Sequence, residues 1–544
     1  MVLVNSLSRY GDGCLMTLAD GIQKSFPIQK LLRMKAAERA RNFALRNPVS
    51  SQREIFFDLV TKAAETRFGR ENDFRSLSEL PFDSACRKFR SGIPLRNYRE
   101  FAADCFCHGL PHDSACRNPP FLDNVTWPGV VRMFCETSGT TAPSKFIPFT
   151  SQMFAENRRA ALDMISCYLS SFPESTLPTG KILYMSGSTR LTEVRSGVWS
   201  GDMSALTLRF RPWYISPFVE PNIAVSDLPW EEKLQAMAEL LLSDRRIRAI
   251  SGVPPWIILL LKRCIDIGRK PLSLLLPELE LIVHGGTSLK PYRNELENLF
   301  EGKVPRLLEL LPSSEAFMAF QMVGEEHMRL TPYYGVFFEF VRFDDLDANG
   351  KPLPHAETLL LEQVETGVRY AIVISSCSGL WRYHIGDTIR FVSTDPHLIE
   401  FCGRDRVLDR FEEKVTQDEV EQAVADLNRD GGWNVREFMA GADIRNRRHI
   451  WVLAMKNGDQ QSDDPSGILD AALCGMNADY STFRRQGRIT PPCVIIVSED
   501  EIYRWSSEER GKLGGQSKIP HIDPTEDSSM IASLVNFCSS GQPG

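Results

Sequence analysis

A run of hydroxyl-bearing residues that ends in a lysine is the part of this sequence best suited to chemistry. The sequence CETSGTTAPSKFIP places several Ser and Thr side chains close to Gly139 and Lys145. Hydroxyl and backbone N–H groups can donate hydrogen bonds to phosphate oxygens, glycine lets the backbone approach closely, and lysine supplies a cation. The segment does not match GxxxxGK[ST], so it is not a Walker A loop. It predicts either a phosphate-binding loop or an ordinary Ser/Thr turn.

The segments that must position this loop alternate between strand and helix patterns. From residue 181 onward, the aliphatic runs KILYM, RAISGV and ELELIVHG are separated by helical periods at residues 231–242 and 256–267. This alternation predicts α/β layers. Farther along, five strand-like runs follow one another too closely for helices to separate most of them. These runs are FFEFV, TLLLEQV, RYAIVIS, TIRFV and LIEFC. Residues 337–401 therefore predict a β-rich subdomain.

A smaller unit with an α+β pattern is predicted at the end of the chain. The charged stretch RDRVLDRFEEK leads into a helical period at residues 418–427, and the runs HIWVLAM and CVIIVS flank a segment long enough for a further helix. We therefore expect an α/β protein with two domains. Residues 1–407 form a large N-terminal domain of layered sheets with the β-rich subdomain, and residues 408–544 form a small α+β domain.

Composition and charge exclude several classes of protein. Of the 544 residues, 43% are hydrophobic and 24% are charged, which is typical of a globular protein. The chain has 63 Lys and Arg but 70 Asp and Glu, so it lacks the basic excess that binds nucleic acid. Thirteen scattered cysteines predict reduced thiols and a cytoplasmic location. The first residues do not resemble a signal peptide, and no apolar run approaches the roughly 20 residues of a membrane helix.

One group of cysteines and histidines leaves a metal site open as an alternative. Cys105, Cys107, His108, His112 and Cys116 occur close together. The last three would share one face of a helix, but Gly109 and a neighbouring proline should break it. The sequence favours a loop with incidental thiols over a metal site.

Three motifs follow one another along the chain. The first consists of Thr137, Ser138, Gly139, Thr140 and Thr141 with Lys145, and the second consists of Ser313, Ser314 and Glu315. The third motif is GLWRYHIGD, which ends at Asp387. In this order they resemble the motifs of a family of adenylate-forming enzymes, the plant auxin-responsive acyl-acid amido synthetases and their bacterial relatives, within the firefly-luciferase-like superfamily. The segments HGGTSLKPYR, YGVFFEF and ETGVRYAIVIS resemble bacterial members, and the similarity covers roughly residues 31–520.

The resemblance implies that the N-terminal domain binds ATP and the acyl acid. Glu315 would hold Mg²⁺, since one carboxylate together with phosphate oxygens and water suits this cation. Asp387, which follows Gly386 at a predicted turn between strands, would accept hydrogen bonds from the ribose hydroxyls. Arg404 would contact ribose or phosphate, and Gly286 would form a backbone wall for adenine. Each of these residues also has a purely structural alternative, such as a salt bridge or a turn.

The resemblance further implies that the C-terminal domain is mobile. Lys518, in GQSKIP, corresponds to the lysine that swings in to hold the substrate carboxylate and the α-phosphate. A cation there would stabilise charge only in the closed state. A solvated lysine in a tail is the structural alternative.

Some positions depart from the family pattern. Leu311 replaces the aromatic residue that lies against adenine, Ala142 and Pro143 replace small or glycine residues in the first loop, and FEE replaces Phe-Gly-Glu after the third motif. The acyl pocket is less clearly marked, since Trp199 and Trp256 could line an apolar slot or belong to the core.

We therefore expect an ATP- and Mg²⁺-dependent ligase. It would activate a carboxylic acid as an acyl-adenylate and transfer the acyl group to an amine or amino acid. A coenzyme A ligase with the same first step is one alternative. A noncatalytic acyl-binding member, suggested by Leu311 and Pro143, is the other.

Overall fold

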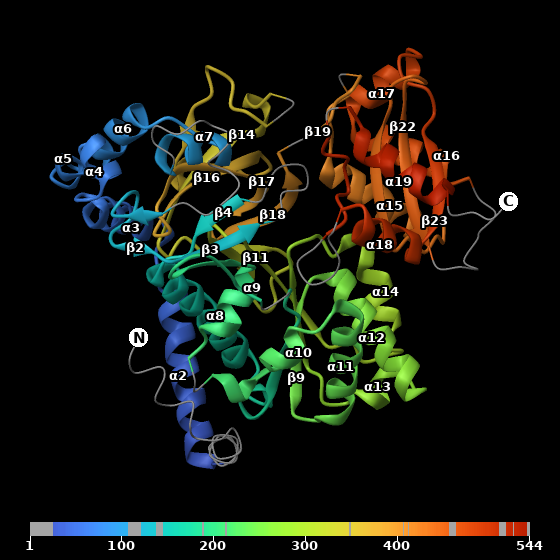
Figure 1. Cartoon of the computed structure of the whole chain (residues 1–544), viewed down its shortest axis with the longest axis horizontal. Helices are drawn as coiled ribbons and strands as arrows, with labels where there is room; N and C mark the ends of the chain where they lie inside the picture. The colour runs from blue at the N-terminus through green and yellow to red at the C-terminus, as the bar shows by residue number, and fades with distance from the viewer. Residues whose placement is uncertain are drawn as a thin grey trace.

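The chain folds around one large mixed sheet, with a separate small sheet near the C-terminus (Figure 1). The computed structural model describes residues 25–106, 121–137, 145–187, 190–212, 215–347, 350–405, 407–411, 413–455, 464–510, 518–525 and 527–540. The large sheet has twelve strands in the order β15-β14-β16-β17-β18-β13-β12-β11-β10-β9-β5-β8.

One half of the large sheet is parallel, as the alternating pattern predicts. Strands β8, β5, β9, β10 and β11 pair in parallel. Helices α11 and α12 cross between them, and α12 buries nearly continuous aliphatic residues because it is covered by the sheet and by α11. The α/β layers are thereby confirmed. The elements are β5 (Lys181–Tyr184), β8 (Val219–Glu220), α11 (Trp230–Ser243), β9 (Ile247–Gly252), α12 (Pro254–Gly268), β10 (Leu281–Gly285), α14 (Arg293–Asn298) and β11 (Arg306–Pro312).

The other half of the large sheet is antiparallel and confirms the β-rich subdomain. One expected strand is much shorter than predicted. In TLLLEQV only Thr358 and Leu359 form β15, and a 3-10 turn follows them. The elements are β12 (Phe317–Gln321), β13 (Met328–Leu330), β14 (Val336–Arg342), β15 (Thr358–Leu359), β16 (Arg369–Ser376), β17 (Leu380–Thr394) and β18 (His397–Arg404).

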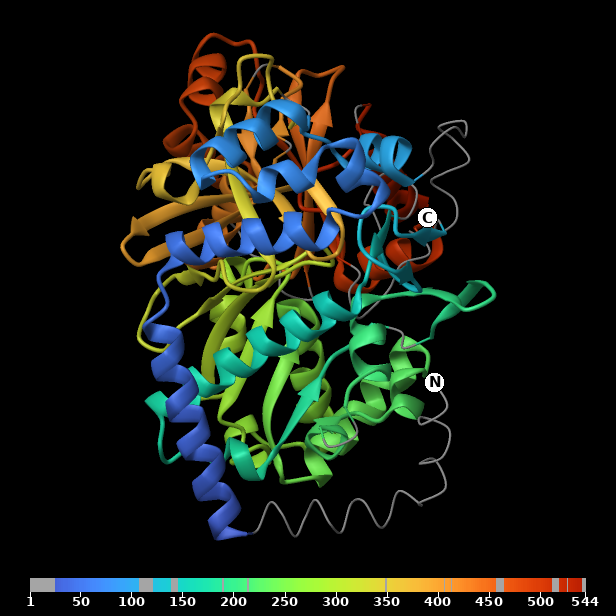
Figure 2. The ribbon, with the colours of Figure 1, turned by 90° about the vertical axis from the view of Figure 1, so that its left-hand side faces the viewer.

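The N-terminal helices and a second sheet cover this core. Helix α2 packs along α8, beside the green half of the chain, whereas α3 packs on β14, and the blue helices from α3 onward lie over the yellow-to-orange strands in Figure 2. The second sheet has the order β4-β3-β7-β6. The elements are α2 (Phe26–Ala44), α3 (Pro48–Ala63), α4 (Arg67–Glu71), α5 (Phe74–Ser78), α6 (Phe82–Gly92), α7 (Tyr98–Phe101), β3 (Met133–Thr137), β4 (Lys145–Pro148), α8 (Ser151–Ser171), β6 (Thr192–Arg195), β7 (Val198–Gly201) and α9 (Met203–Arg209).

The C-terminal part forms its own α+β lobe, drawn in orange and red in Figure 1. Its three-stranded sheet has the order β21-β22-β23, and one of its apolar clusters begins at Leu408. Helix α15 begins with a capping box in which Thr416 and Glu419 satisfy each other's backbone N–H groups. The elements are β19 (Val407–Leu408), β20 (Val415–Thr416), α15 (Gln417–Asp430), β21 (Glu437–Asp443), β22 (Arg448–Met455), α16 (Pro465–Met476), α17 (Ala478–Arg485), β23 (Cys493–Ser498), α18 (Glu499–Glu508) and α19 (Ser529–Ser540).

Two further observations bear on the expected class of protein. Within the described ranges, none of the helices combines the length and the apolarity that crossing a membrane requires. Ten cysteines fall within those ranges and all of them have free thiols.

Candidate active site

The first motif lies where two antiparallel strands join. Thr137 ends β3 and pairs directly with Lys145, the first residue of β4. Ser138, Gly139, Thr140 and Thr141 belong to the connection between them and lie outside the described residues. Lys145 Nζ lies 6.0 Å from the centre of the Tyr98 ring. Burial lowers the pKa of Lys145, whereas the nearby carboxylates of Glu315 and Asp387 oppose that shift.

The second motif forms a tight connection between β11 and β12. Ser313 Oγ accepts hydrogen bonds from the backbone N–H groups of Glu315, at 3.2 Å, and Ala316, at 3.0 Å. The Ser313 hydroxyl therefore shapes the turn, and Ser314 is only half-buried beside it. The Glu315 side chain is buried, and Tyr383 Oη lies 3.5 Å from its Oε1 atom. The turn thus holds a single buried carboxylate whose charge acts to raise the pKa of Lys145.

Asp387 lies within a strand and not at a turn, which corrects the sequence-based expectation. It belongs to the long strand β17. Ala371 of β16 pairs with Thr388, but Val373 pairs with His384, so β17 carries extra residues between these pairs. Such a bulge re-aims the side chains around it. Gly386, at the bulge, has a φ of +88°, which glycine adopts without strain.

Arg404 lies directly beside Asp387. The two residues are partners across β17 and β18, and Arg404 Nη1 donates a hydrogen bond to Asp387 Oδ1 at 2.6 Å. The charge of Asp387 raises the pKa of Arg404 above its usual value. The Asp387 side chain is 13% exposed and that of Arg404 is 50% exposed. The pair is therefore open on one side, where a ligand can approach both groups.

Lys518 reaches this site from the C-terminal lobe. Its Nζ atom donates a hydrogen bond to the backbone oxygen of Gly286, immediately after β10. Gly286 has a φ of +85°, and a Cβ atom at this position would lie 2.9 Å from Lys518 Nζ. Burial lowers the pKa of Lys518 to about 8, although the charge of Asp387 opposes that shift. The structure therefore describes a closed arrangement of the two lobes.

The structure brings together most of the described residues that the sequence singled out. The charges of Glu315, Asp387 and Arg404 all influence the pKa of Lys145. The charges of Asp387 and Glu315 influence the pKa of Arg404, and those of Asp387 and Arg404 influence the pKa of Lys518. Arg404 is the residue that the others share. Five side chains from four distant parts of the chain thus form one charged centre.

Sequence reasoning missed two residues of this centre. Tyr383 faces Glu315, and His384 Nε2 lies 3.3 Å from Asp405 Oδ2. Burial lowers the pKa of His384 to about 4, so its imidazole is neutral near pH 7. Both residues lie within GLWRYHIGD, so the third motif already contained the stretch that carries them.

The structure also resolves three positions that the sequence left open. Leu311 is buried in the main apolar core. Trp256 is 3% exposed, and its ring packs on Trp230 and, across the lobes, on Tyr503, so it does not line an open slot. Cys105 is buried, whereas His108, His112 and Cys116 lie outside the described residues. Within the described part of the chain, no group of three His, Cys, Asp or Glu residues could hold a metal ion.

The fold matches solved structures of adenylate-forming ligases. A GH3.15 acyl acid amido synthetase in complex with 2,4-DB superposes with a TM-score of 0.68 at 17% sequence identity, over 93% of this chain and 96% of the other. A 2-hydroxyisobutyryl-CoA ligase in the postadenylation state gives a TM-score of 0.54 at 11% identity, over 90% and 92% of the two chains. The expected fold class is confirmed.

The family follows from the sequence comparisons. Models of three GH3 family domains match in order: the N-terminal domain at residues 39–251, the central domain at residues 330–404 and the C-terminal domain at residues 416–526. The chain belongs to the GH3 family.

Curated relatives in plants carry amido synthetase names. A probable indole-3-acetic acid-amido synthetase of Arabidopsis thaliana is 26% identical over 266 residues, which is 44% of this chain and 42% of the relative. A jasmonoyl–L-amino acid synthetase of Nicotiana attenuata is 26% identical over 266 residues, or 45% and 44% of the two chains. The matches thus span less than half the length of these relatives.

Proposed function

We propose that the protein is an ATP-dependent acyl-acid amido synthetase. In the first step, a carboxylate oxygen of the acid attacks the α-phosphorus of ATP, and the bond to pyrophosphate breaks. In the second step, the nitrogen of an amine or amino acid attacks the acyl carbon, loses a proton and displaces AMP. The observation that carries this proposal is the convergence of Lys518 from one lobe with Gly286, Asp387 and Arg404 from the other.

Each described residue has a role that fits its surroundings. Asp387 has a free face from which to accept hydrogen bonds from ribose hydroxyls, while Arg404 holds it in place. Gly286, which has no side chain, offers a flat backbone wall against which adenine fits. Lys145 would contact phosphate together with Thr137 and the hydroxyls of the first motif. Ser313 would act indirectly, by holding the turn that presents Glu315.

Lys518 stabilises negative charge on the α-phosphate and on the incoming carboxylate. Its cation is held in a half-buried position, where electrostatic interactions are stronger than in bulk water. Lys518 belongs to the C-terminal lobe, so its side chain reaches this position only when the two lobes are close together. We therefore place the domain boundary between residues 407 and 408, where an apolar cluster of that lobe begins.

A divalent cation is part of this proposal. Glu315 is a buried carboxylate whose contact with Tyr383 leaves an oxygen atom for a ligand, which fits Mg²⁺ bound through one carboxylate, phosphate oxygens and water. The cation would supply charge neutralisation at the phosphates. A cytoplasmic location and a bacterial source remain predictions from the sequence.

The two alternatives differ from the proposed function in different steps. A coenzyme A ligase would have another second step, and a noncatalytic member would lack the first step. A coenzyme A ligase would use the same charged centre for adenylation, and its fold is shared by a structural neighbour. A noncatalytic member was suggested by Leu311 and Pro143. Leu311 belongs to the core and leaves the charged centre intact, and Pro143 lies outside the described residues.

A pyrophosphate-release screen tests the proposal. The protein is incubated with ATP, Mg²⁺ and pooled carboxylic acids that include indole-3-acetic and jasmonic acid, and amino acids, simple amines or coenzyme A are then added as acceptors. An amide and AMP as products would support the proposal. A thioester formed only with coenzyme A would favour the first alternative, and absence of ATP binding would favour the second. Lys518→Met serves as the matched control, in which adenylation should be about 10²- to 10³-fold slower.

A further inference from the structure

A short turn beside the charged centre touches the C-terminal lobe through each of its three residues. The 3-10 turn η4 (Lys290–Tyr292) follows Gly286 closely in the sequence. Lys290 Nζ donates to Asp418 Oδ1 at 3.0 Å, in the first turn of α15. The backbone oxygen of Pro291 accepts from Asn428 Nδ2 at 3.3 Å. The η4 turn is thus a docking element between the lobes.

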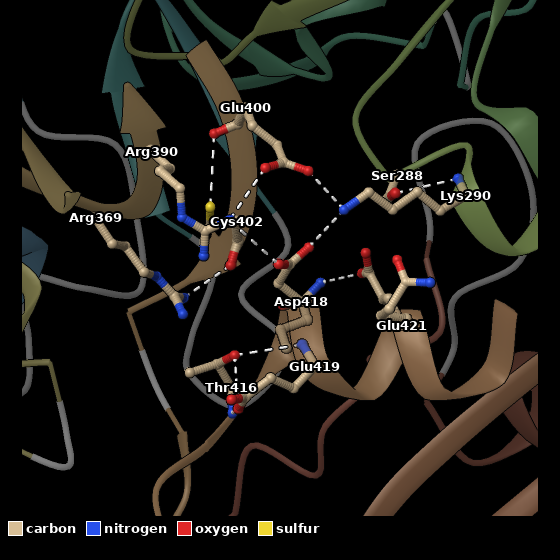
Figure 3. A network of polar contacts seen from close by, with 12 residues as sticks. Ser288, Lys290, Arg369, Arg390, Glu400, Cys402, Thr416, Asp418, Glu419 and Glu421 are labelled. Atoms are coloured by element: carbon tan, nitrogen blue, oxygen red, sulfur yellow. Dashed lines mark hydrogen bonds and ion pairs between the residues drawn. The ribbon is translucent and has the colours of Figure 1, made fainter. Parts of the chain in front are cut away.

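Lys290 belongs to a compact group of four alternating charges (Figure 3). It also donates to Glu400 Oε1 at 2.7 Å, and Arg390 Nη1 lies 3.1 Å from Glu400 Oε2 and 4.0 Å from Asp418 Oδ2. Burial alone would lower the pKa of Lys290, but the charges of Asp418 and Glu400 outweigh it and raise the pKa. Asp418 is the only one of the four that comes from the C-terminal lobe, so separation of the lobes would break its contacts with both cations.

Tyr292 connects the turn to the segment that carries Lys518. Its Oη atom lies 3.3 Å from Glu437 Oε2 and 3.3 Å from Nε2 of His521, three residues beyond Lys518. His521 Nδ1 lies 2.8 Å from Glu421 Oε1 of α15, and its ring stacks on Phe438 with a centroid distance of 4.1 Å. His521 is buried, so this end of the Lys518 segment is fixed on both sides.

We propose that η4 is a latch for the closed state and that Lys290 and Tyr292 are positioning residues for adenylation. They do not touch the reacting atoms. They hold α15 and the His521 segment in the arrangement that seats Lys518 at Gly286. This inference rests on the proposed function and adds residues outside the three motifs. In the proposed function Lys518 acts on the α-phosphate during the first step, so aminolysis should not require the latch.

The first experiment compares the two half reactions in Lys290→Met, Asp418→Asn and the double variant. Each single variant should slow pyrophosphate release by about threefold to tenfold, the range for losing one partly buried ion pair. The double variant should be little worse than either single variant, because the two changes remove the same contact. Aminolysis of supplied acyl-adenylate should stay within about twofold of wild type. Tyr292→Phe should also slow pyrophosphate release and leave aminolysis nearly unchanged.

Arg293→Met is the matched control. Arg293 follows η4 directly and pairs with Glu297 on its own helix at 3.3 Å, without a contact to the other lobe in the described structure. It should leave both half reactions unchanged. The latch is refuted if Lys290→Met adenylates at the wild-type rate, or if both half reactions fall equally, which would indicate general damage to the fold.

A second measurement tests the latch without depending on activity. Backbone hydrogen exchange over residues 518–525 should become about threefold to tenfold faster in Lys290→Met, and should be unchanged in Arg293→Met. Unchanged exchange in Lys290→Met would overturn the latch even if the protein is an active synthetase. Faster exchange in a protein that releases no pyrophosphate with any acid would support the latch and contradict the proposed function.

Discussion

Removal of the Lys518 cation is the sharpest test of the closed site. Its amine is held against the Gly286 carbonyl, half-buried and close to Asp387 and Arg404. Lys518→Met keeps most of the side-chain length and removes the charge. Loss of one preorganised electrostatic group typically slows a reaction by about 10²- to 10³-fold. We expect adenylation to fall by this factor, while ATP affinity and aminolysis of supplied acyl-adenylate change little.

The pH dependence of the same residue gives an independent test. Burial lowers the pKa of Lys518 to about 8, so its protonated form is lost at a lower pH than for an ordinary lysine. Since kcat/KM reports on ionisations of the free enzyme, kcat/KM for adenylation should fall as the pH rises through about 8. This basic limb should be absent in Lys518→Met.

A substitution at Gly286, the other partner of the Lys518 contact, provides a second test. In Gly286→Ala, the new Cβ atom would lie 2.9 Å from Lys518 Nζ on a backbone with a φ of +85°, so the amine must move. This variant should also lose adenylation. Stopped-flow pyrophosphate release and a separate aminolysis assay measure the two steps. Wild-type adenylation in Lys518→Met, or a loss confined to aminolysis, would refute the reasoning.

Three further predictions concern single carboxyl groups. Asp387→Asn should weaken ATP binding, because a neutral amide is a poorer acceptor for ribose hydroxyls and loses its ion pair with Arg404; calorimetry that gave equal affinity would remove Asp387 from the site. Glu315→Gln should raise the Mg²⁺ concentration needed for adenylation, and an unchanged Mg²⁺ titration would place the cation elsewhere. Glu437 is buried, which raises its pKa from 4.5 to about 7. The folded state therefore binds the extra proton, and the stability that this contributes is present below about pH 4.5 and lost as the pH rises through about 7. Between pH 6 and 8, the Tm of wild type should fall relative to that of Glu437→Gln, and parallel Tm curves would contradict this.

Patterns with a short range along the chain were sufficient to predict much of the fold. The run KILYM became β5, and the helical period at residues 231–242 became α11, because burial on a sheet imposes apolar periodicity on each segment separately. The length of a strand was predicted less well where pairing with a neighbouring strand decides it. TLLLEQV is as apolar as its neighbours, but only its first two residues are paired by β14.

The same distinction applies to the candidate site. The sequence by itself determined the types and order of the candidate site residues, since Lys145, Glu315, Asp387 and Lys518 could each be singled out from the motif around them. Only the tertiary structure decided where these groups lie. The bulge that aims Asp387 arises from a register shift between β16 and β17. The position of Lys518 depends on a glycine 232 residues earlier. Contacts between such distant segments leave no local periodicity in the chain, because they arise only when separate elements pack together.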